Sequence, residues 1–149
     1  RDSMVGSRNE TYLYYGRAAA NPDDVVTFIP ARISALLLVA SAVLCGYSAS
    51  NAWRIFKRDR MKHASPNSAQ TESAMAGALG VQLAGDAWYF GELHKKETIG
   101  DALREIEPED IDCANRILYG MVVLGTVLGV LLKGCVLVCM STAGILPPI

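Results

Sequence analysis

The chain has 149 residues, of which 51% are hydrophobic, and its formal net charge is −1 at pH 7. With 14 basic and 15 acidic residues it gives no argument for nucleic-acid binding, and we expect no nucleic-acid partner. The hydrophobic residues are concentrated in two regions, whereas a soluble domain spreads them along the chain. This composition favours an all-α integral membrane protein in which hydrophobic helices are separated by a polar loop region.

The first segment, residues 1–32, is polar and aromatic. Asn21-Pro22 followed by Asp23 and Asp24 predicts a helix start, because proline suits the first helical position and acidic residues favour the positive end of the helix dipole. The two adjacent carboxylates have two interpretations. They stabilise the helix end, or they bind a hard cation such as Mg²⁺.

The next segment, residues 33–50, contains eighteen residues without a charge and predicts a hydrophobic helix. Such a helix is about 27 Å long, close to the roughly 30 Å hydrocarbon core of a bilayer. The basic stretch RIFKRDRMKH follows, and positive charge beside a span indicates its cytoplasmic end. We therefore expect a multi-pass protein of the cell (inner, cytoplasmic) membrane that contacts membrane lipid.

Residues 51–116 are expected to form a cytoplasmic motif loop. Within it, residues 62–85 (KHASPNSAQTESAMAGALGVQLAG) predict a polar turn that opens a helix of small residues. Small residues such as Gly77 and Gly80 allow either a neighbouring helix or a ligand to approach the backbone closely. Residues 86–107 show neither a helical nor a strand period, which indicates a structured loop with short elements.

The last hydrophobic region covers residues 117–146. Pro108, followed by two acidic residues, predicts a helix start from which one helix runs unbroken into the membrane. Lys133 would be expensive near the middle of a bilayer, so we expect the segment to end near it or to turn its ammonium to a polar cavity. Gly125 and Gly129 form a GxxxG pattern that favours close helix packing.

Several motifs in order resemble one known family. They are DSMVG (2–6), Asn9, Tyr15-Gly16, the DD and IPAR elements up to Arg32, H-x-SPN-S-x-Q-x-E-x-AMAGALGVQL (63–83), YFG (89–91) and IGD (99–101). Together they resemble the CbiB/CobD family, the adenosylcobinamide-phosphate synthases of cobalamin biosynthesis. The chain begins RDSM, and we expect it to be the C-terminal portion of such a protein. The confusable alternative is a non-catalytic AmpE-like membrane sensor or scaffold.

The resemblance implies an ATP-dependent ligase that also requires Mg²⁺. It would join adenosylcobyric acid to (R)-1-amino-2-propanol phosphate or a related amino-alcohol phosphate through an amide bond. Other corrinoid-pathway membrane enzymes would be possible partners.

The resemblance also implies roles for individual residues. The catalytic candidates are His63, Asn67 and Glu72, and His63 is a candidate base because histidine gains and loses a proton near neutral pH. The substrate-binding candidates are Asp2, Ser3, Asn9, Arg32, Lys62, Ser65, Gln82, Tyr89 and Lys96. The candidate metal ligands are Asp23, Asp24 and Asp101, with Glu72 as a further option.

Two points qualify the resemblance. Thr27 stands where the family often has asparagine, and Ala69 and Ala84 stand where it commonly has glycine; alanine is harmless there only if φ is negative. If residues 33–50 cross the membrane once, motifs 2–32 and 63–101 lie on opposite faces. Either that helix is partly buried or re-entrant, or only one set of motifs carries the chemistry.

Overall fold

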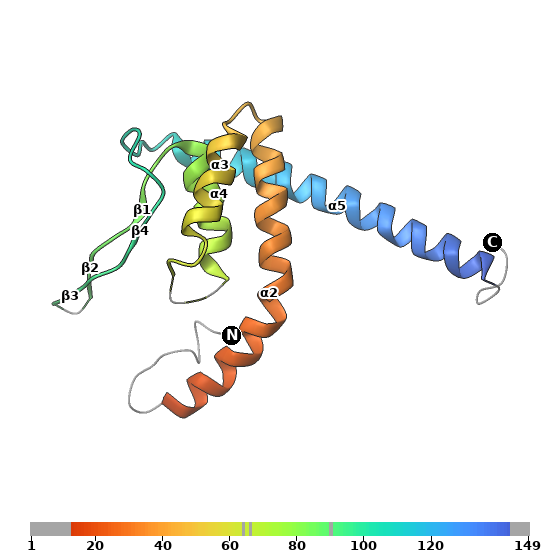
Figure 1. Cartoon of the computed structure of the whole chain (residues 1–149), viewed down its shortest axis with the longest axis horizontal. Coiled ribbons are helices and arrows are strands. Elements are labelled where there is room, and N and C mark those ends of the chain that lie inside the picture. Colours follow the sequence, from red (N-terminus) through yellow and green to blue (C-terminus); the bar gives the residue numbers. More distant parts are fainter. Residues whose placement is uncertain (1–12, 64, 66, 90, 144–149) are drawn as a thin grey trace.

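The computed structural model describes the backbone of residues 13–143, except residues 64, 66 and 90. It describes the side chains of residues 24–143, except those of residues 64, 66, 87, 89, 90, 92 and 94. Its elements in chain order are α2 (Leu13–Leu44), α3 (Ala49–Asp59), α4 (Ser68–Leu79), β1 (Leu83–Ala84), β2 (Ala87–Tyr89), β3 (Glu92–His94), β4 (Thr98–Ile99) and α5 (Asp110–Thr142). Figure 1 shows α2, α3 and α4 side by side, the strands on one flank, and α5 extending away from the end of α2.

The boundaries of α2 differ from those predicted. The helix begins at Leu13 and continues through Pro22, so the predicted helix start at Asn21-Pro22 is wrong. It ends at Leu44 because Gly46 adopts a positive φ of 81°, which reverses the chain. The Ser48 side chain then caps α3 by accepting a hydrogen bond from the backbone N–H of Asn51 at 3.2 Å. Residues 33–50 therefore contain the end of one helix, a tight turn and the start of another.

The basic stretch after this turn is the helix α3, which the sequence analysis treated as part of a loop. Its buried residues are Ala52, Ile55, Phe56 and Asp59, a spacing that lies on one face of a helix. The basic residues occupy the opposite, exposed face. α3 is therefore an amphipathic helix, and it packs on both α2 and α4.

α3 and α4 meet through the small residues of α4. A Cβ added at Gly77 would lie 2.8 Å from both Ala52 Cα and the Asn51 backbone oxygen. Asn51 Nδ2 also donates a hydrogen bond to the Gly77 oxygen at 2.6 Å. Ala74 is fully buried in the same core. The interpretation of this stretch as a helix-packing seam is therefore confirmed, whereas Gly80 ends the helix as its left-handed cap at φ 69°.

α2 and α5 cross at a second small-residue contact. Ser41 Oγ donates to the Ile117 backbone oxygen at 2.7 Å, and a Cβ on Gly120 would collide with that hydroxyl. Of the predicted GxxxG pair, Gly125 lies near Leu37, and a Cβ at Gly129 would have no neighbour within 4 Å in the described structure. The close approach of α5 to α2 is therefore at Gly120, more than one helical turn before the predicted pair Gly125 and Gly129.

The region 83–99 contains two short antiparallel ladders. β1 pairs with β4, with Leu83 opposite Ile99, and β2 pairs with β3, with Trp88 opposite Leu93. Residue Gly100 follows β4 at φ 87°, and a Cβ there would collide with the Val81 backbone oxygen. The expectation of short elements within a structured loop is confirmed.

Two described helices are long and apolar enough to cross a membrane by length and composition. One is Asp24–Leu44, with 21 residues and a mean hydropathy of 1.9, and the other is Asp110–Thr142, with 33 residues and a mean hydropathy of 2.4. α5 begins where predicted and continues unbroken through Lys133, so the helix does not end there. The described residues are mostly helical, as expected. They also form two short antiparallel ladders, which the all-α prediction did not include.

Candidate functional site

The turn between α3 and α4 lies against the first described part of α2. Ser65 Oγ donates to Asp24 Oδ1 at 3.4 Å, and the backbone N–H of Asn67 donates to Ser65 Oγ at 3.4 Å. Because α3 runs back along α2 after the Gly46 turn, residues that are about forty positions apart come together. Ser65 and Asn67 therefore lie beside Asp24, in the α2 part of the first motif set.

Asn67 is the centre of this contact, and its side chain is largely buried. Its Nδ2 donates to Thr27 Oγ1 at 2.7 Å and to the Asp24 backbone oxygen at 3.0 Å. Its Oδ1 accepts a bond from Arg32 Nη1 at 3.4 Å. Both ends of the amide are thus engaged with α2, so Asn67 is held in one orientation.

Arg32 is itself held by a neighbour on α2. Its Nη1 donates to the Phe28 backbone oxygen at 2.7 Å, and the guanidinium lies 3.3 Å from the centroid of the Phe28 ring. A cation over an aromatic face is stabilised by the ring quadrupole. This arrangement keeps a permanent positive charge beside Asn67, where it can bind a phosphate or carboxylate.

His63 lies on the other side of the same turn and is exposed. Its Nδ1 accepts a hydrogen bond from the Ser65 backbone N–H at 3.0 Å. A neutral imidazole that accepts at Nδ1 carries its proton on Nε2, so the outward nitrogen is a donor. This geometry suits hydrogen bonding to an anion, whereas the base role predicted for His63 would require a free lone pair on Nε2.

His63 lines a pocket of about 360 Å³ between the end of α3 and the strand region. Its lining residues are Lys62, His63, Ala84, Lys95, Lys96, Glu97 and Ile99. Three lysines face one glutamate, so the pocket is positively charged. It brings together Lys62, His63 and Lys96, three of the residues predicted for the site.

The strand region is fixed to α3 by a buried carboxylate, Asp59. Asp59 is completely buried, and its oxygens accept bonds from Arg58 at 2.7 Å, from the Gly100 backbone N–H at 2.8 Å and from Lys62 at 2.9 Å. The hydrogen bond from Arg58 is the main cause that holds the pKa of Asp59 well below its usual range, against the opposing effect of burial. Asp59 therefore stays ionised and keeps β4 beside Lys62.

Asp101 continues this network at the surface. Its two oxygens accept bonds at 2.7 Å from Arg54 and from Arg58. These contacts, with Arg58 the larger cause, lower the pKa of the Asp101 carboxyl. Both oxygens are already used by arginines, so Asp101 does not fit a magnesium site together with Asp24.

Asp24 fits a hard cation better. In the described structure its Oδ1 accepts only long hydrogen bonds, from Ser65 Oγ and Asn67 Nδ2 at 3.4 Å each, and carboxylate oxygen is a ligand atom that Mg²⁺ prefers. Within the residues that the structure describes, no group of three or more His, Cys, Asp or Glu side chains lies together. The magnesium role of Asp24 stays a prediction.

The remaining predicted residues lie elsewhere or outside the described part. Glu72 is half-buried on α4, and Gln82 is exposed and lines a different pocket together with Arg104. Asp2, Ser3 and Asn9 lie outside the described residues, as do the side chains of Asp23 and Tyr89.

Sequence reasoning missed three residues of this region. Thr27 was noted only as a departure from the family, and Asp59 and Lys95 were not named as candidates. For Asp59 the available signal was a single acidic residue three positions before Lys62, a distance that the turn after α3 closes into an ion pair.

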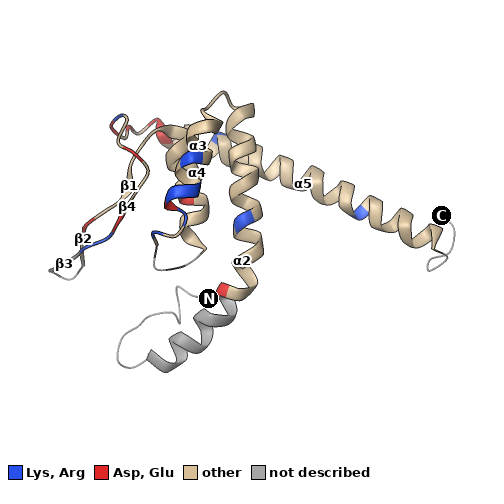
Figure 2. Cartoon of the chain, in the orientation of Figure 1, with Lys and Arg blue, Asp and Glu red and all other residues tan. Residues whose placement is uncertain are grey.

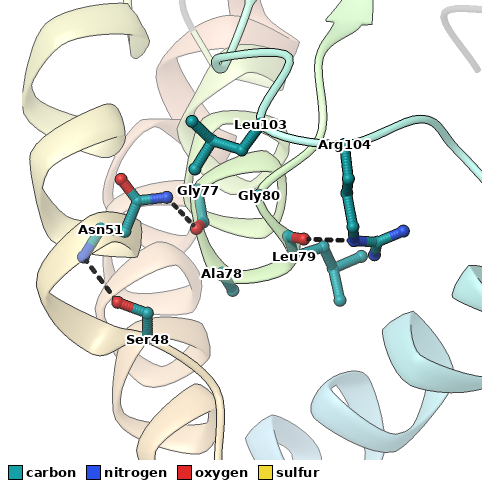
Figure 3. Close-up of a pocket in the computed structure, with 8 residues that line it drawn as sticks. All are labelled: Ser48, Asn51, Gly77, Ala78, Leu79, Gly80, Leu103 and Arg104. Carbon is teal, nitrogen blue, oxygen red and sulfur yellow. Dashed lines mark hydrogen bonds between the residues drawn. The ribbon is translucent and has the colours of Figure 1, made fainter.

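A further pocket of about 320 Å³ lies at the opposite end of α3 and α4, as Figure 3 shows. Its polar atoms are bonded within the protein: Asn51 Nδ2 donates to the Gly77 oxygen at 2.6 Å, and Arg104 Nε donates to the Leu79 oxygen at 3.2 Å. The first bond joins α3 to α4, and the second joins the segment that leads to α5 to the end of α4. The pocket is therefore explained by packing.

Taken together, the described chain is a helical protein with two helices of membrane-spanning length and a polar site at the turn between α3 and α4. The family described as CobD/Cbib protein matches residues 1–118. The chain therefore belongs to the CobD/CbiB family, and of the two families weighed from the sequence this match supports the first.

Curated relatives agree with the family match. The chain is 52% identical over 117 residues to the cobalamin biosynthesis protein CobD of Desulfotalea psychrophila, covering 78% of this chain and 36% of that protein. It is 46% identical over 136 residues to the protein of the same name from Clostridium perfringens, covering 91% and 43%. It is 49% identical over 119 residues to the cobalamin biosynthesis protein CbiB of Salmonella arizonae, covering 80% and 37%. The chain thus spans about two fifths of the length of these relatives, and no solved structure matches it significantly.

Proposed function

We propose that this chain acts in cobalamin biosynthesis as part of an adenosylcobinamide-phosphate synthase. The reaction would join a carboxylate of adenosylcobyric acid to the amine of (R)-1-amino-2-propanol phosphate, or a related amino-alcohol phosphate, at the expense of ATP. The observation that carries the proposal is the contact between two motif segments of this family, Asp24 to Arg32 and Ser65 to Asn67, within one polar site.

The reaction needs an activated carboxylate, because a carboxylate anion is a poor electrophile. Transfer of the terminal phosphoryl group of ATP to the carboxylate gives an acyl phosphate and ADP. The amine then attacks the acyl carbon, the C–N bond forms, the C–O bond to phosphate breaks, and the amine loses a proton. A site for these steps must orient two substrates and neutralise several phosphate charges.

The residues of the site suit these tasks. Asn67, fixed by Thr27 and Asp24, would orient a substrate amide through the second lone pair of its Oδ1. Arg32 supplies a permanent cation beside it for the phosphoryl group. Mg²⁺, when bound, would neutralise phosphate charge, and Asp24 is the described residue best suited to hold it.

The two long apolar helices favour a membrane location for the enzyme. α5 is exposed along nearly its whole length, and its apolar side chains would find a favourable environment in lipid. We propose a multi-pass protein of the cytoplasmic membrane with the site on the side where ATP is available.

Turnover by a variant of Asn67 tests the proposal. We expect Asn67→Ala to lower the rate of ATP-dependent cobinamide phosphate formation about 100-fold, because removing one preorganised hydrogen-bonding group costs roughly 3 kcal/mol in the transition state. The measurement uses membranes that contain the protein in its natural full length, and chromatography detects the product.

The matched control is Asn115→Ala on the exposed face of α5, which should keep the wild-type rate. Immunoblots of the membrane fraction verify equal amounts of all proteins. If the wild-type protein forms no cobinamide phosphate from these substrates, the proposed function is wrong. If Asn67→Ala turns over normally, the residue is not part of the site.

A further inference from the structure

We propose that the pocket formed by Lys62, His63, Lys95 and Lys96 binds the doubly charged phosphate of a phosphomonoester. This inference rests on the proposed function for its biological role and narrows it, because the reaction uses two molecules that carry a terminal phosphate. The pocket itself is argued from geometry and charge.

The pocket exists because β4 is fixed to the end of α3. The Gly100 backbone N–H donates to Asp59 Oδ2 at 2.8 Å, and Lys62 Nζ donates to the Thr98 backbone oxygen at 3.2 Å. These two bonds place the segment just before β4, which carries the other two lysines, beside the α3–α4 turn. Figure 2 shows lysines and arginines in blue along α3 and the turn after it, and again in the strand region.

The rim of the pocket is fixed at a second point. The backbone N–H of Lys96 donates to Asp86 Oδ1 at 3.1 Å, which ties the segment before β4 to the segment before β2. Ala84 on β1 and Ile99 on β4, which lie diagonally across the paired strands, form the apolar wall. The lysine backbone is therefore positioned by the fold, while the long side chains can adjust to a ligand.

The donors of the pocket suit a phosphate group. Lys62 donates to Asp59 and Thr98 in the described structure, and an ammonium has three N–H groups, so a third remains for a ligand. His63 presents Nε2–H because its Nδ1 accepts from Ser65. Lys95 and Lys96 add two positive charges against the one negative charge of Glu97, and together with Lys62 they leave the pocket with a positive charge that attracts a phosphomonoester dianion.

The volume of the pocket limits which ligands can enter it. A volume of about 360 Å³ lies at the lower end of the roughly 300–1,000 Å³ typical of small-molecule pockets, and a corrin would not fit. A short amino-alcohol phosphate and the terminal phosphate of ATP both present the required chemistry. The apolar wall at Ala84 and Ile99 suits the short carbon chain of the former.

Asp59 acts as the positioning residue of the pocket. It touches no ligand, but it holds Lys62 at 2.9 Å and the Gly100 backbone at 2.8 Å. The Asp59 carboxylate also pairs with Arg58. Asp59 therefore fixes the position of Lys62 without neutralising the positive charge of the pocket. Loss of Asp59 would release both the lysine and the strand.

Equilibrium dialysis of the full-length protein with labelled inorganic phosphate tests the pocket directly. We expect wild-type protein to bind phosphate and the double variant Lys95→Gln/Lys96→Gln to bind it at least tenfold more weakly. Lys57→Gln is the matched control, because Lys57 lies on α3 against the Trp53 ring and outside the pocket, and it should bind as wild type does. His63→Ala should weaken binding, whereas His63→Gln, which keeps an N–H donor, should retain most of it.

Competitors distinguish the source of the phosphate. Unlabelled ethanolamine phosphate or ATP should displace inorganic phosphate, and the stronger competitor identifies the natural ligand, whereas ethanolamine alone should not compete. Absence of phosphate binding by the wild type, or an equal loss in the Lys57→Gln control, overturns the proposal.

Kinetics separate this inference from the proposed function. If the protein forms the amide but Lys95→Gln/Lys96→Gln leaves KM for both phosphorylated substrates unchanged, the pocket assignment falls and the function stands. If no amide is formed but the double variant loses phosphate binding, the pocket stands and the function falls.

Discussion

At the scale of single residues, backbone conformation decides between two alanines that look alike in the sequence. Ala69 lies in α4 with helical backbone, so replacing the family's common glycine there introduces no strain. Ala84 has a positive φ of 61°, a region that an L-residue with a Cβ enters only at a cost. Ala84 therefore stores strain at the wall of the basic pocket.

Exchange of Ala84 for glycine tests this strain. We expect Ala84→Gly to stabilise the protein by about 0.5–1 kcal/mol, because the relief of backbone strain exceeds the added entropy of the unfolded chain. Ala69→Gly, the same substitution in helical backbone, should instead destabilise by about 1 kcal/mol. Thermal unfolding of the purified protein measures both, and destabilisation by Ala84→Gly would contradict the assigned conformation.

Asp59 makes stability depend on pH. A carboxyl whose pKa is lowered on folding contributes stability above its ordinary pKa of about 3.9, and this contribution is lost as pH falls below that value. We expect Asp59→Asn to destabilise the protein at neutral pH by about 3 kcal/mol, the lower end for a broken buried pair, because Arg58 and Lys62 are partly exposed.

Unfolding curves at several pH values check this expectation. The difference in stability between wild type and Asp59→Asn should shrink as pH is lowered from about 6 to about 3. Asp112→Asn, an exposed aspartate at the start of α5, serves as the control. A difference that stays constant over this range would show that the charge of Asp59 is not responsible.

At the scale of elements, glycines mark the places where helices approach closely. Gly77 permits the contact of α4 with α3, and Gly120 permits the contact of α5 with α2. Both contacts also carry a hydrogen bond from a polar side chain to a backbone oxygen, from Asn51 and from Ser41. At each of these two crossings, one glycine permits the close approach and one polar side chain adds a hydrogen bond.

Exchange of Gly77 for alanine separates packing from helix propensity. Alanine favours a helix by about 1 kcal/mol over glycine, but at Gly77 its Cβ would lie 2.8 Å from Ala52 Cα. We expect Gly77→Ala to destabilise by about 1–3 kcal/mol through overpacking. Gly129→Ala, where the added Cβ meets no described atom within 4 Å, should be neutral or mildly stabilising.

Fluorescence of Trp53 provides the readout for α3. Trp53 stacks on Phe56 with ring centroids 5.3 Å apart, so its emission responds to the loss of α3 packing. Equal midpoints for Gly77→Ala and wild type would show that the α3–α4 seam can relax without loss of stability.

At the scale of the whole molecule, the sequence predicted what depends on local patterns. The start of α5 after Pro108 was predicted because proline and acidic residues act within one turn, and the small-residue helix α4 was predicted from its composition. The helix α3 was missed because its basic face resembles a juxtamembrane run, although Ala52, Ile55 and Phe56 form a helical stripe.

The site was predicted only in pieces, because contacts between distant residues leave no local pattern. Asn67 and Arg32 were both predicted as site residues, but their contact depends on the turn at Gly46 and the return of α3 along α2. The basic pocket likewise depends on the attachment of β4 to Asp59. The motifs predicted most of the residues of the site from the sequence. The reversal of the chain at Gly46 then places these residues next to one another.

The contact between Asn67 and Thr27 also sets the order in which the site is formed. The two residues are 40 positions apart, and translation adds about 5–20 residues per second, so Thr27 is synthesised about 2–8 seconds before its partner. The polar site is therefore completed only when α4 packs on α2, and the activity proposed for this site depends on that packing.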